Sequence, residues 1–204
     1  MARNIELKVR VDDVDALVAH AGRCADGPPA TIEQDDTFYA VPHGRLKLRR
    51  SAEGGAELIH YRRPDGPGAR ASEYLRVPCA DSETLHAMLA EALGTVGRVR
   101  KRRLLLLAGP TRIHLDRVEG RGDFVELEVV LRPGQSDADG RAIALGLLDA
   151  LGLAGAEEVE CAYVDLPAGR SDADGVPAPL QNAGSDVRRT KTLRRRERTR
   201  RRGR

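Results

Sequence analysis

The chain has 204 residues, enough for one domain of ordinary size or two small ones, and only 3% of them are aromatic. The net charge of +3 is unevenly placed: residues 170–204 hold 12 Lys and Arg against 4 Asp and Glu, so the remainder holds 22 against 27, a net of −5. Three widely spaced cysteines without a CxxC or Cys/His cluster argue against a disulfide framework or a structural zinc site. Because no signal-peptide pattern and no run of about 18 apolar residues is present, we expect a soluble, cytoplasmic protein.

The first half of the chain predicts one helix among five strands. The helix covers residues 12–23, where Asp12 and Asp13 in the first turn precede apolar residues at helical spacing. The strands show period-2 alternation or are bounded by Gly and Pro turns, and they cover residues 4–11, 36–41, 44–51, 56–63 and 70–77.

The second half predicts two helices, which flank a group of three strands. Helix 81–93 has Asp81 or Ser82 as its N-cap, and its predicted buried stripe comprises Leu85, Met88, Leu89 and Leu93. The remaining elements are strands 96–108, 110–118 and 123–132, a helix over 137–151 and a short final strand over 158–166. Roughly eight mostly sequential strands joined by tight turns predict an α+β fold with a closed or nearly closed antiparallel sheet and flanking helices. Such a barrel can enclose one small ligand.

The composition changes after residue 166. Residues 167–187 are rich in Ala, Gly, Pro, Ser and Asp, which is typical of a linker, and residues 188–204 contain 11 Lys and Arg in 17 positions. We therefore expect a folded domain over 1–166 and a disordered basic tail. Such a tail can contact nucleic acid or another polyanion through phosphate neutralisation. The alternative is a merely solubilising segment, since no aromatic residue interleaves the charges.

Charged residues alternate with apolar residues along several predicted strands, so that each strand has one charged face. On alternation alone, these rows are either solvated faces of half-buried strands or the walls of a cavity for polyanions and metal ions. A triphosphate carries about four negative charges and needs several converging Lys and Arg side chains, together with Mg²⁺ or Mn²⁺ held by carboxylates. The chain supplies basic rows and, at Glu126 and Glu128, two carboxylates about 7 Å apart on one strand face.

The segment Asn4-Ile5-Glu6-Leu7-Lys8 resembles the ExExK signature of the CYTH superfamily, which unites class IV adenylyl cyclases and thiamine triphosphatases as triphosphate tunnel metalloenzymes. The resemblance covers roughly residues 1–166 and continues, in order, through Arg45-Leu46-Lys47-Leu48-Arg49, Val99-x-Lys101-x-Arg103, Arg112-Ile113-His114-Leu115-Asp116 and Gly120-x-Gly122-x-Phe124-x-Glu126-x-Glu128. It implies an eight-stranded antiparallel tunnel with the charged rows pointing inward. It is also compatible with a homodimer.

Transferred residue by residue, the resemblance implies Mg²⁺ or Mn²⁺ ligands at Glu6, Glu126 and Glu128, assisted by Asp116. It implies triphosphate contacts at Lys8, Lys47, Arg49, Lys101, Arg103 and Arg112, with Arg45 and Arg63 as further contacts. Lys8 also matches the signature lysine, and neighbouring cations would lower its pKa as a general base requires. His114 is expected to line or support the tunnel rather than act as the base. Asn4 replaces the first signature glutamate, and its amide oxygen brings no charge to a metal.

Three functions remain open at this point. In a cyclase, the ribose 3′-OH of ATP attacks the α-phosphorus and gives cyclic AMP and pyrophosphate. In a hydrolase, water attacks a terminal phosphorus of tripolyphosphate or of a nucleoside or thiamine triphosphate. The Ile-His-Leu-Asp and Gly-x-Gly-x-Phe-x-Glu-x-Glu segments resemble those of the class IV cyclases more closely, and this resemblance favours the cyclase. The third function, suggested by Asn4, is a polyphosphate-binding module with little turnover.

Overall fold

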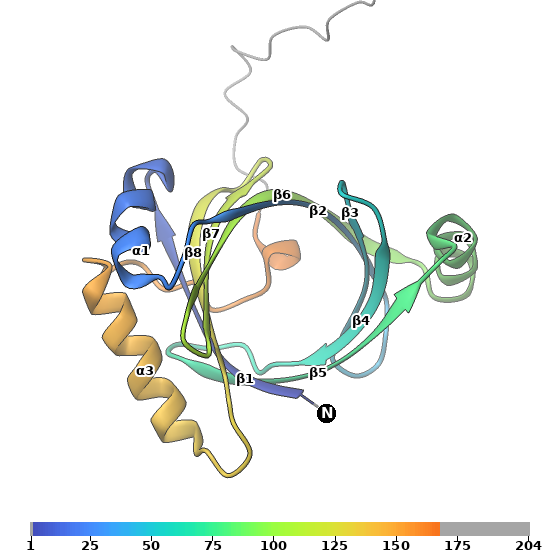
Figure 1. Ribbon diagram of the computed structural model, residues 1–204. Coiled ribbons are helices and arrows are strands. Elements are labelled where there is room, and N and C mark those ends of the chain that lie inside the picture. Colours follow the sequence, from blue (N-terminus) through green and yellow to red (C-terminus); the bar gives the residue numbers. More distant parts are fainter. Residues whose placement is uncertain (1, 168–204) are drawn as a thin grey trace, which may run out of the picture. The chain divides into compact units, whose positions relative to one another are not determined.

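The computed structural model describes residues 2–167, which form a closed barrel of eight antiparallel strands flanked by three α-helices (Figure 1). The strands are β1 Ala2–Val11, β2 Ala30–Tyr39, β3 Arg45–Ser51, β4 Ala56–Arg62, β5 Arg70–Cys79, β6 Thr95–Ala108, β7 Thr111–Val118 and β8 Gly122–Val130. The helices are α1 Val18–Cys24, α2 Ser82–Leu93 and α3 Asp137–Ala150, with short 3-10 turns at Asp15–Leu17 and Tyr163–Asp165. Within the described part of the chain, no helix has the length and apolar character of a membrane span.

The barrel closes because β8 pairs back onto β1, in the order β1-β5-β4-β3-β2-β6-β7-β8. Consecutive strands pair with each other from β2 to β5 and again from β6 to β8. Two long-range pairings, β1 with β5 and β2 with β6, connect these groups. Closure gives every strand of the barrel a paired neighbour on both sides. The predicted α+β fold with a closed antiparallel barrel is therefore confirmed.

The apolar rows of β1, β7 and β8 point outward, where α1 and α3 cover them (Figure 1). Ile5 and Val9 of β1 are completely buried there, and each such side chain contributes about 1.5–3 kcal/mol to stability. Helix α3 approaches β1 closely at Gly140, where a Cβ atom would lie 2.5 Å from the Ile5 side chain. Because this apolar cluster lies outside the sheet, the alternate charged residues of the same strands point into the barrel. A second, smaller apolar cluster comprises Phe38, Val99, Val118, Phe124, Val159 and Tyr163.

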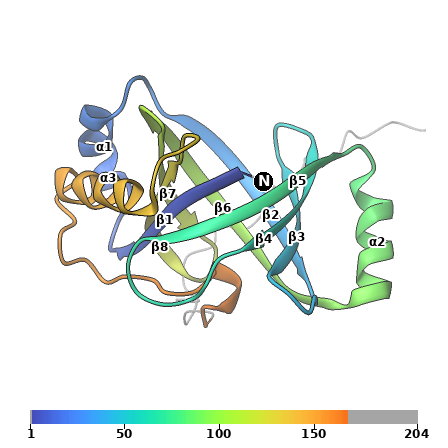
Figure 2. The same ribbon diagram turned by 90° about the horizontal axis from the view of Figure 1, so that it is seen from below.

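Helix α2 begins as predicted but packs differently. The Asp81 side chain accepts a hydrogen bond from the Thr84 amide at 3.0 Å, which confirms the N-cap. The predicted buried stripe is wrong, since no α2 residue is fully buried and Met88 is 63% exposed. Polar contacts to the barrel hold the helix, including one of 2.8 Å between Tyr39 Oη and His86 Nδ1. Figure 2 shows α2 apart from α1 and α3, so its apolar face meets no second layer.

Three other predicted boundaries change. Strand β2 begins at Ala30 rather than at residue 36, because residues 30–35 pair with β6. The predicted helix over 12–23 becomes the 3-10 turn Asp15–Leu17 followed by α1. The predicted final strand over 158–166 is wrong: it forms one isolated bridge between Glu158 and Val9 and the 3-10 turn Tyr163–Asp165. The β1–β5 pairing ends at Glu6, and of residues 2–167 only 157–159 bond to the edge of β1 beyond it, which is too short a stretch for a strand. The predicted basic tail over 188–204 and all but Pro167 of the linker over 167–187 lie outside the described residues.

Residues 157–166, called here the closing segment, cross the end of the barrel where β1 ends and β5 begins (Figure 2). The Arg10 amide donates to the Glu157 carbonyl at 2.8 Å, and the Val159 amide donates to the Lys8 carbonyl at 2.9 Å. The Arg70 guanidinium, at the start of β5, donates to the Val159 carbonyl at 3.2 Å. We call this end the closed end and the opposite one the open end.

Candidate active site

The barrel encloses a cavity of about 260 Å³, and the charged side chains that point inward line it. Side-chain exposure rises along it from 3% at Lys8, beside the closing segment, to 32% at Arg112, near the open end. Ten of the twelve predicted site residues line this cavity: Glu6, Lys8, Lys47, Arg49, Arg63, Lys101, Arg103, Arg112, Glu126 and Glu128. The alternation therefore marks an internal charged surface rather than a solvated outer face.

Arg45 and Asp116, the other two predicted residues, do not line the cavity. Arg45 lies at the closed end and pairs with Asp65 and Asp165, each at 2.7 Å. Asp116 is completely buried and accepts a hydrogen bond of 2.8 Å from the Tyr163 hydroxyl. It also accepts two hydrogen bonds from Arg103, at 2.6 and 2.5 Å. Arg45 therefore anchors the closing segment through Asp165. Asp116 holds the Arg103 guanidinium in place without lining the cavity itself.

Asp36 of β2 is a lining residue that the sequence analysis missed. The register places it opposite Arg49, which donates to it at 2.8 Å from both Nε and Nη2, and Lys47 donates at 2.8 Å. Burial alone would raise the pKa of Asp36, but Lys47 and Arg49 hold it well below its usual range. The predicted strand began at Asp36 itself, so the sequence offered no alternating row to mark the residue.

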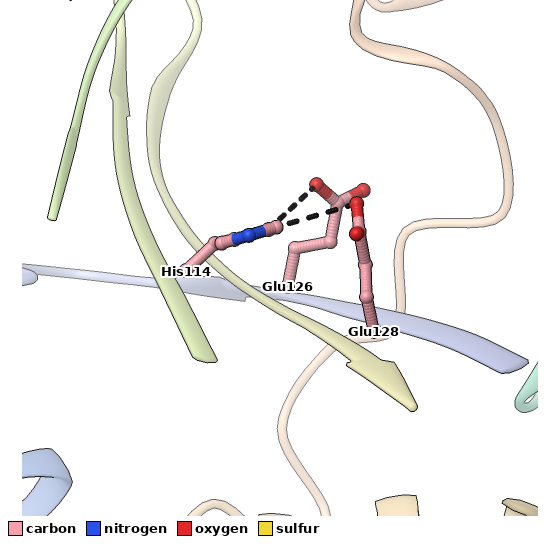
Figure 3. Close-up of side chains that lie close together, drawn as sticks. All are labelled: His114, Glu126 and Glu128. Carbon is pink, nitrogen blue, oxygen red and sulfur yellow. Dashed lines mark ion pairs between the residues drawn. The ribbon is translucent and has the colours of Figure 1, made fainter. Parts of the chain in front are cut away.

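A second group of side chains comes from β7 and β8 (Figure 3). His114 Nδ1 lies 3.6 Å from one carboxylate oxygen of Glu126 and 3.7 Å from one of Glu128. Ligand atoms from the three residues lie within 4.8 Å of one another, which makes them a candidate metal centre. Burial alone would raise the pKa of Glu126, but Lys8, His114 and Arg103 hold it well below its usual value. Glu126 is therefore ionised, as a metal ligand needs to be.

Glu6 and Asn4 of β1 extend this group. Burial, with repulsion from Glu128 and Glu126, raises the pKa of Glu6, although Arg63 donates to it at 3.0 Å. Asn4 is 2% exposed and lines the cavity, and its Oδ1 has no hydrogen-bond partner among the described residues. Carboxylate and amide oxygens are the ligands that Mg²⁺ and Mn²⁺ prefer. The residues present therefore fit a hard divalent cation.

Two buried amines lie near the closed end. Lys8 Nζ is 3.4 Å from Glu126 Oε1 and 3.9 Å from the centre of the Tyr163 ring. Burial lowers the pKa of Lys8. Burial, together with repulsion from Arg103, lowers the pKa of Lys101 to about 7. Each amine can therefore exchange a proton more readily than an exposed lysine.

Uncharged side chains complete the lining. Ser72 and Tyr74 of β5 line the cavity. Other members carry no charge and were missed: Ile32, Gln34, Ile59 and Leu105. They point inward because of where they fall in the alternation of β2, β4 and β6. An uncharged side chain in a strand does not by itself indicate whether it faces the cavity or the outside.

Comparison with known proteins agrees with this geometry. The model of the CYTH domain family matches residues 2–163. Adenylate cyclase CyaB of Aeromonas hydrophila is 29% identical over 164 residues, which are 75% of this chain and 82% of that protein. The solved PH1012 protein of Pyrococcus horikoshii OT3 shares the fold, with a TM-score of 0.69 and 22% identity over 80% of this chain and 98% of its own.

A third similar protein, with a TM-score of 0.55 and 15% identity, is a putative adenylyl cyclase from Hippeastrum whose structure is described as revealing a dominant triphosphatase activity. The alignment covers 75% of this chain and 89% of that one. The two solved structures support the barrel fold, while the family model accounts for nearly all of the described residues. From its first strand to the closing segment, this chain belongs to the CYTH family.

Proposed function

We propose that this protein is a metal-dependent enzyme that acts on a triphosphate and converts ATP to cyclic AMP and pyrophosphate, as the class IV adenylyl cyclases do. The observation that carries the proposal is one cavity lined by both cations and carboxylates. Lys47, Arg49 and Arg103 supply positive charge from β3 and β6, and Glu6, Glu126 and Glu128 supply negative charge from β1 and β8. A metal–triphosphate complex needs both kinds of charge, carboxylates for the metal ion and cations for the phosphate oxygens.

We assign Glu6, Glu126 and Glu128 as ligands of Mg²⁺ or Mn²⁺, with the Asn4 amide oxygen as a further donor. When bound, the ion would neutralise phosphate charge and polarise the phosphorus under attack. These carboxylates pair with Arg63, Arg103 and Arg112 respectively, at 3.0, 2.8 and 3.1 Å. Metal binding would therefore free these guanidinium groups for phosphate oxygens, which couples metal and substrate binding.

Lys8 is the proposed general base. Its buried amine, with its lowered pKa, can accept the proton of the attacking hydroxyl. Lys101 and the guanidinium groups of Arg63, Arg103 and Arg112 would hold the phosphates and stabilise the charge that develops on the leaving pyrophosphate. Asp116 fixes the Arg103 guanidinium in place through two hydrogen bonds, so it acts as a positioning residue.

Hydrolysis of a triphosphate is the second candidate function. The same cations and carboxylates serve it, and water replaces the ribose hydroxyl as the nucleophile. The description of the Hippeastrum protein favours this candidate, because its dominant activity is that of a triphosphatase on the same fold. Asn4, a neutral residue in the acidic group, motivates the third possibility, a polyphosphate-binding module with little turnover.

One assay separates the three functions. Purified protein is incubated with ATP or tripolyphosphate and Mg²⁺ or Mn²⁺, and cyclic AMP, pyrophosphate and phosphate are measured. Cyclic AMP with equimolar pyrophosphate supports the cyclase. Phosphate without cyclic AMP overturns the cyclase and supports the hydrolase. Tight triphosphate binding without any product supports the binding module.

A further inference from the structure

Tyr163 of the closing segment places its ring against two amines that come from different parts of the barrel. The ring centre lies 3.9 Å from Lys8 Nζ and 4.9 Å from Lys101 Nζ, and the ring lines the cavity beside them. Lys8 belongs to β1 and Lys101 to β6, and β7 and β8 separate these strands in the sheet order. Because β1 and β6 are not paired with each other, the ring of Tyr163 is a direct link between their amines.

The hydroxyl of Tyr163 fixes the position of this ring. It donates to Asp116 Oδ2 at 2.8 Å, and the same oxygen lies 3.5 Å from Lys101 Nζ and accepts a hydrogen bond from Arg103 at 2.5 Å. Tyr163 is 6% exposed, and its ring packs on Phe124 with the ring centres 5.0 Å apart. A hydrogen bond at the hydroxyl and packing against the ring together hold Tyr163 beside the amines.

The closing segment also holds Lys8 at both ends of the residue. The Val159 amide donates to the Lys8 carbonyl at 2.9 Å, and the Lys8 amine donates to the Cys161 carbonyl at 3.4 Å. A free lysine side chain samples many rotamers, because its four-carbon stem is flexible. These contacts, together with the Tyr163 ring, select the rotamers that bring the Lys8 amine to the cavity.

We infer that Tyr163 is a positioning residue that holds the Lys8 and Lys101 amines in place for the reaction, so that the closing segment completes the active site. The face of an aromatic ring attracts an ammonium group, and the attraction is stronger away from water. The inference rests on the proposed function, in which Lys8 is the general base and Lys101 binds phosphate. It goes beyond that function by giving a catalytic consequence to a segment outside the eight strands, which acts only through the two amines.

The test compares kcat and KM in two variants of Tyr163, for the triphosphate that the wild-type protein turns over fastest. Tyr163→Leu removes the aromatic face, and we expect it to lower kcat about tenfold or more, since a small displacement of a catalytic group is costly. It should also raise the dissociation constant of tripolyphosphate, measured by calorimetry, because Lys101 loses the ring as well. Tyr163→Phe keeps the ring and should retain kcat within about twofold, although it loses the hydrogen bond to Asp116.

Tyr39→Leu and Tyr39→Phe are the matched controls. Tyr39 is 2% exposed and its hydroxyl lies 2.8 Å from His86 Nδ1, but it does not line the cavity. Both controls should lower the free energy of unfolding, as the Tyr163 variants do, yet retain kcat and tripolyphosphate binding. A merely structural role of Tyr163 would instead make kcat follow stability in all four variants.

Wild-type kcat and tripolyphosphate affinity in Tyr163→Leu would overturn the inference. It is equally overturned if Tyr163→Phe or Tyr39→Leu loses as much kcat as Tyr163→Leu does. If the wild-type protein turns over no triphosphate, the proposed enzymatic function fails, and the tripolyphosphate dissociation constants alone decide on the role of Tyr163. Should Tyr163→Leu fail to fold, Tyr163→Met carries the test, because its flexible apolar side chain has no aromatic face.

Discussion

Asp36 and Arg49 form a two-pronged ion pair inside the barrel, with Nε and Nη2 of the arginine each 2.8 Å from a different carboxylate oxygen. Lys47 shares the same carboxylate at 2.8 Å, and Asp36 is only 2% exposed. One buried anion thus fixes the direction of two cations that we propose to contact phosphate. A planar, bidentate ion pair of this kind fixes the orientation of the guanidinium group and also strengthens the interaction.

Replacing Asp36 by Asn should destabilise the protein strongly, because Lys47 and Arg49 would remain as buried cations without their carboxylate. Removing one partner of a buried ion pair costs about 3–5 kcal/mol in the free energy of unfolding. Urea unfolding followed by circular dichroism measures the change. The control is Asp35→Asn on the same strand, whose outward pair with the half-exposed Arg98 is worth about 1 kcal/mol or less. Equal stability of both variants would contradict the proposed role of Asp36.

Stability should fall as the pH falls below about 4, the usual pKa of an aspartate in an unfolded chain. The pKa of Asp36 and that of Asp116 are held below this value by Lys47 and Arg49 and by Arg103 and Lys101, although burial opposes the shift. The folded state therefore binds fewer protons than the unfolded state, and acid favours unfolding.

Urea midpoints measured between pH 6 and pH 2.5 test this dependence. The slope against pH should be shallower in Asp36→Asn than in the wild type, because one of the shifted carboxyls is gone. A pH dependence identical in the two proteins would show that Asp36 titrates alike in the folded and unfolded states.

Glu126→Ala should abolish metal-dependent turnover, because this carboxylate belongs to the candidate metal centre with His114 and Glu128. Product formation is measured across a titration of Mg²⁺ or Mn²⁺, and Mn²⁺ binding is followed separately by electron paramagnetic resonance. Glu119→Ala is the matched control, since Glu119 is 61% exposed and pairs with Arg100 on the outside. Wild-type turnover in Glu126→Ala would refute the assignment of Glu126 as a ligand.

Tyr163→Phe and Tyr163→Ala should destabilise the protein to different degrees. The hydroxyl donates to Asp116 at 2.8 Å, and the ring packs on Phe124 with centres 5.0 Å apart. Phe loses one hydrogen bond to a charged group, about 1.5–3 kcal/mol, whereas Ala also leaves a cavity and reaches about 3–5 kcal/mol. Thermal and urea unfolding measure both. If Phe were as costly as Ala, the ring would contribute nothing to fixing the closing segment.

Deleting residues 170–204 should leave a protein that unfolds cooperatively at nearly the wild-type urea midpoint. Residues 2–167 contain every barrel strand and both apolar clusters. The slope of the unfolding free energy against urea reports how much surface unfolding exposes. Loss of the cooperative transition on deletion would show that the basic segment is part of the folded domain.

The sequence by itself determined most of the strand content and the division of several strands into an apolar and a charged face. Ile5, Leu7 and Val9 alternate with Glu6 and Lys8, and period 2 sends the two sets to opposite sides of any sheet. The resemblance of successive charged motifs to the CYTH signature also indicated the closed barrel and ten of the residues that line its cavity.

The tertiary structure decided what no local pattern encodes. Whether Asp36 meets Arg49 depends on the β2–β3 register, and whether Ile59 and Tyr74 share a cavity with Leu105 depends on the order in which the strands close. The β1–β5 pairing ends at Glu6, so residues 157–159 bond briefly to the remaining edge of β1 and the rest of the closing segment crosses the end of the barrel instead of adding a strand. Alternation fixes a side chain's face within its own strand, whereas its neighbours across the barrel are set by long-range pairing.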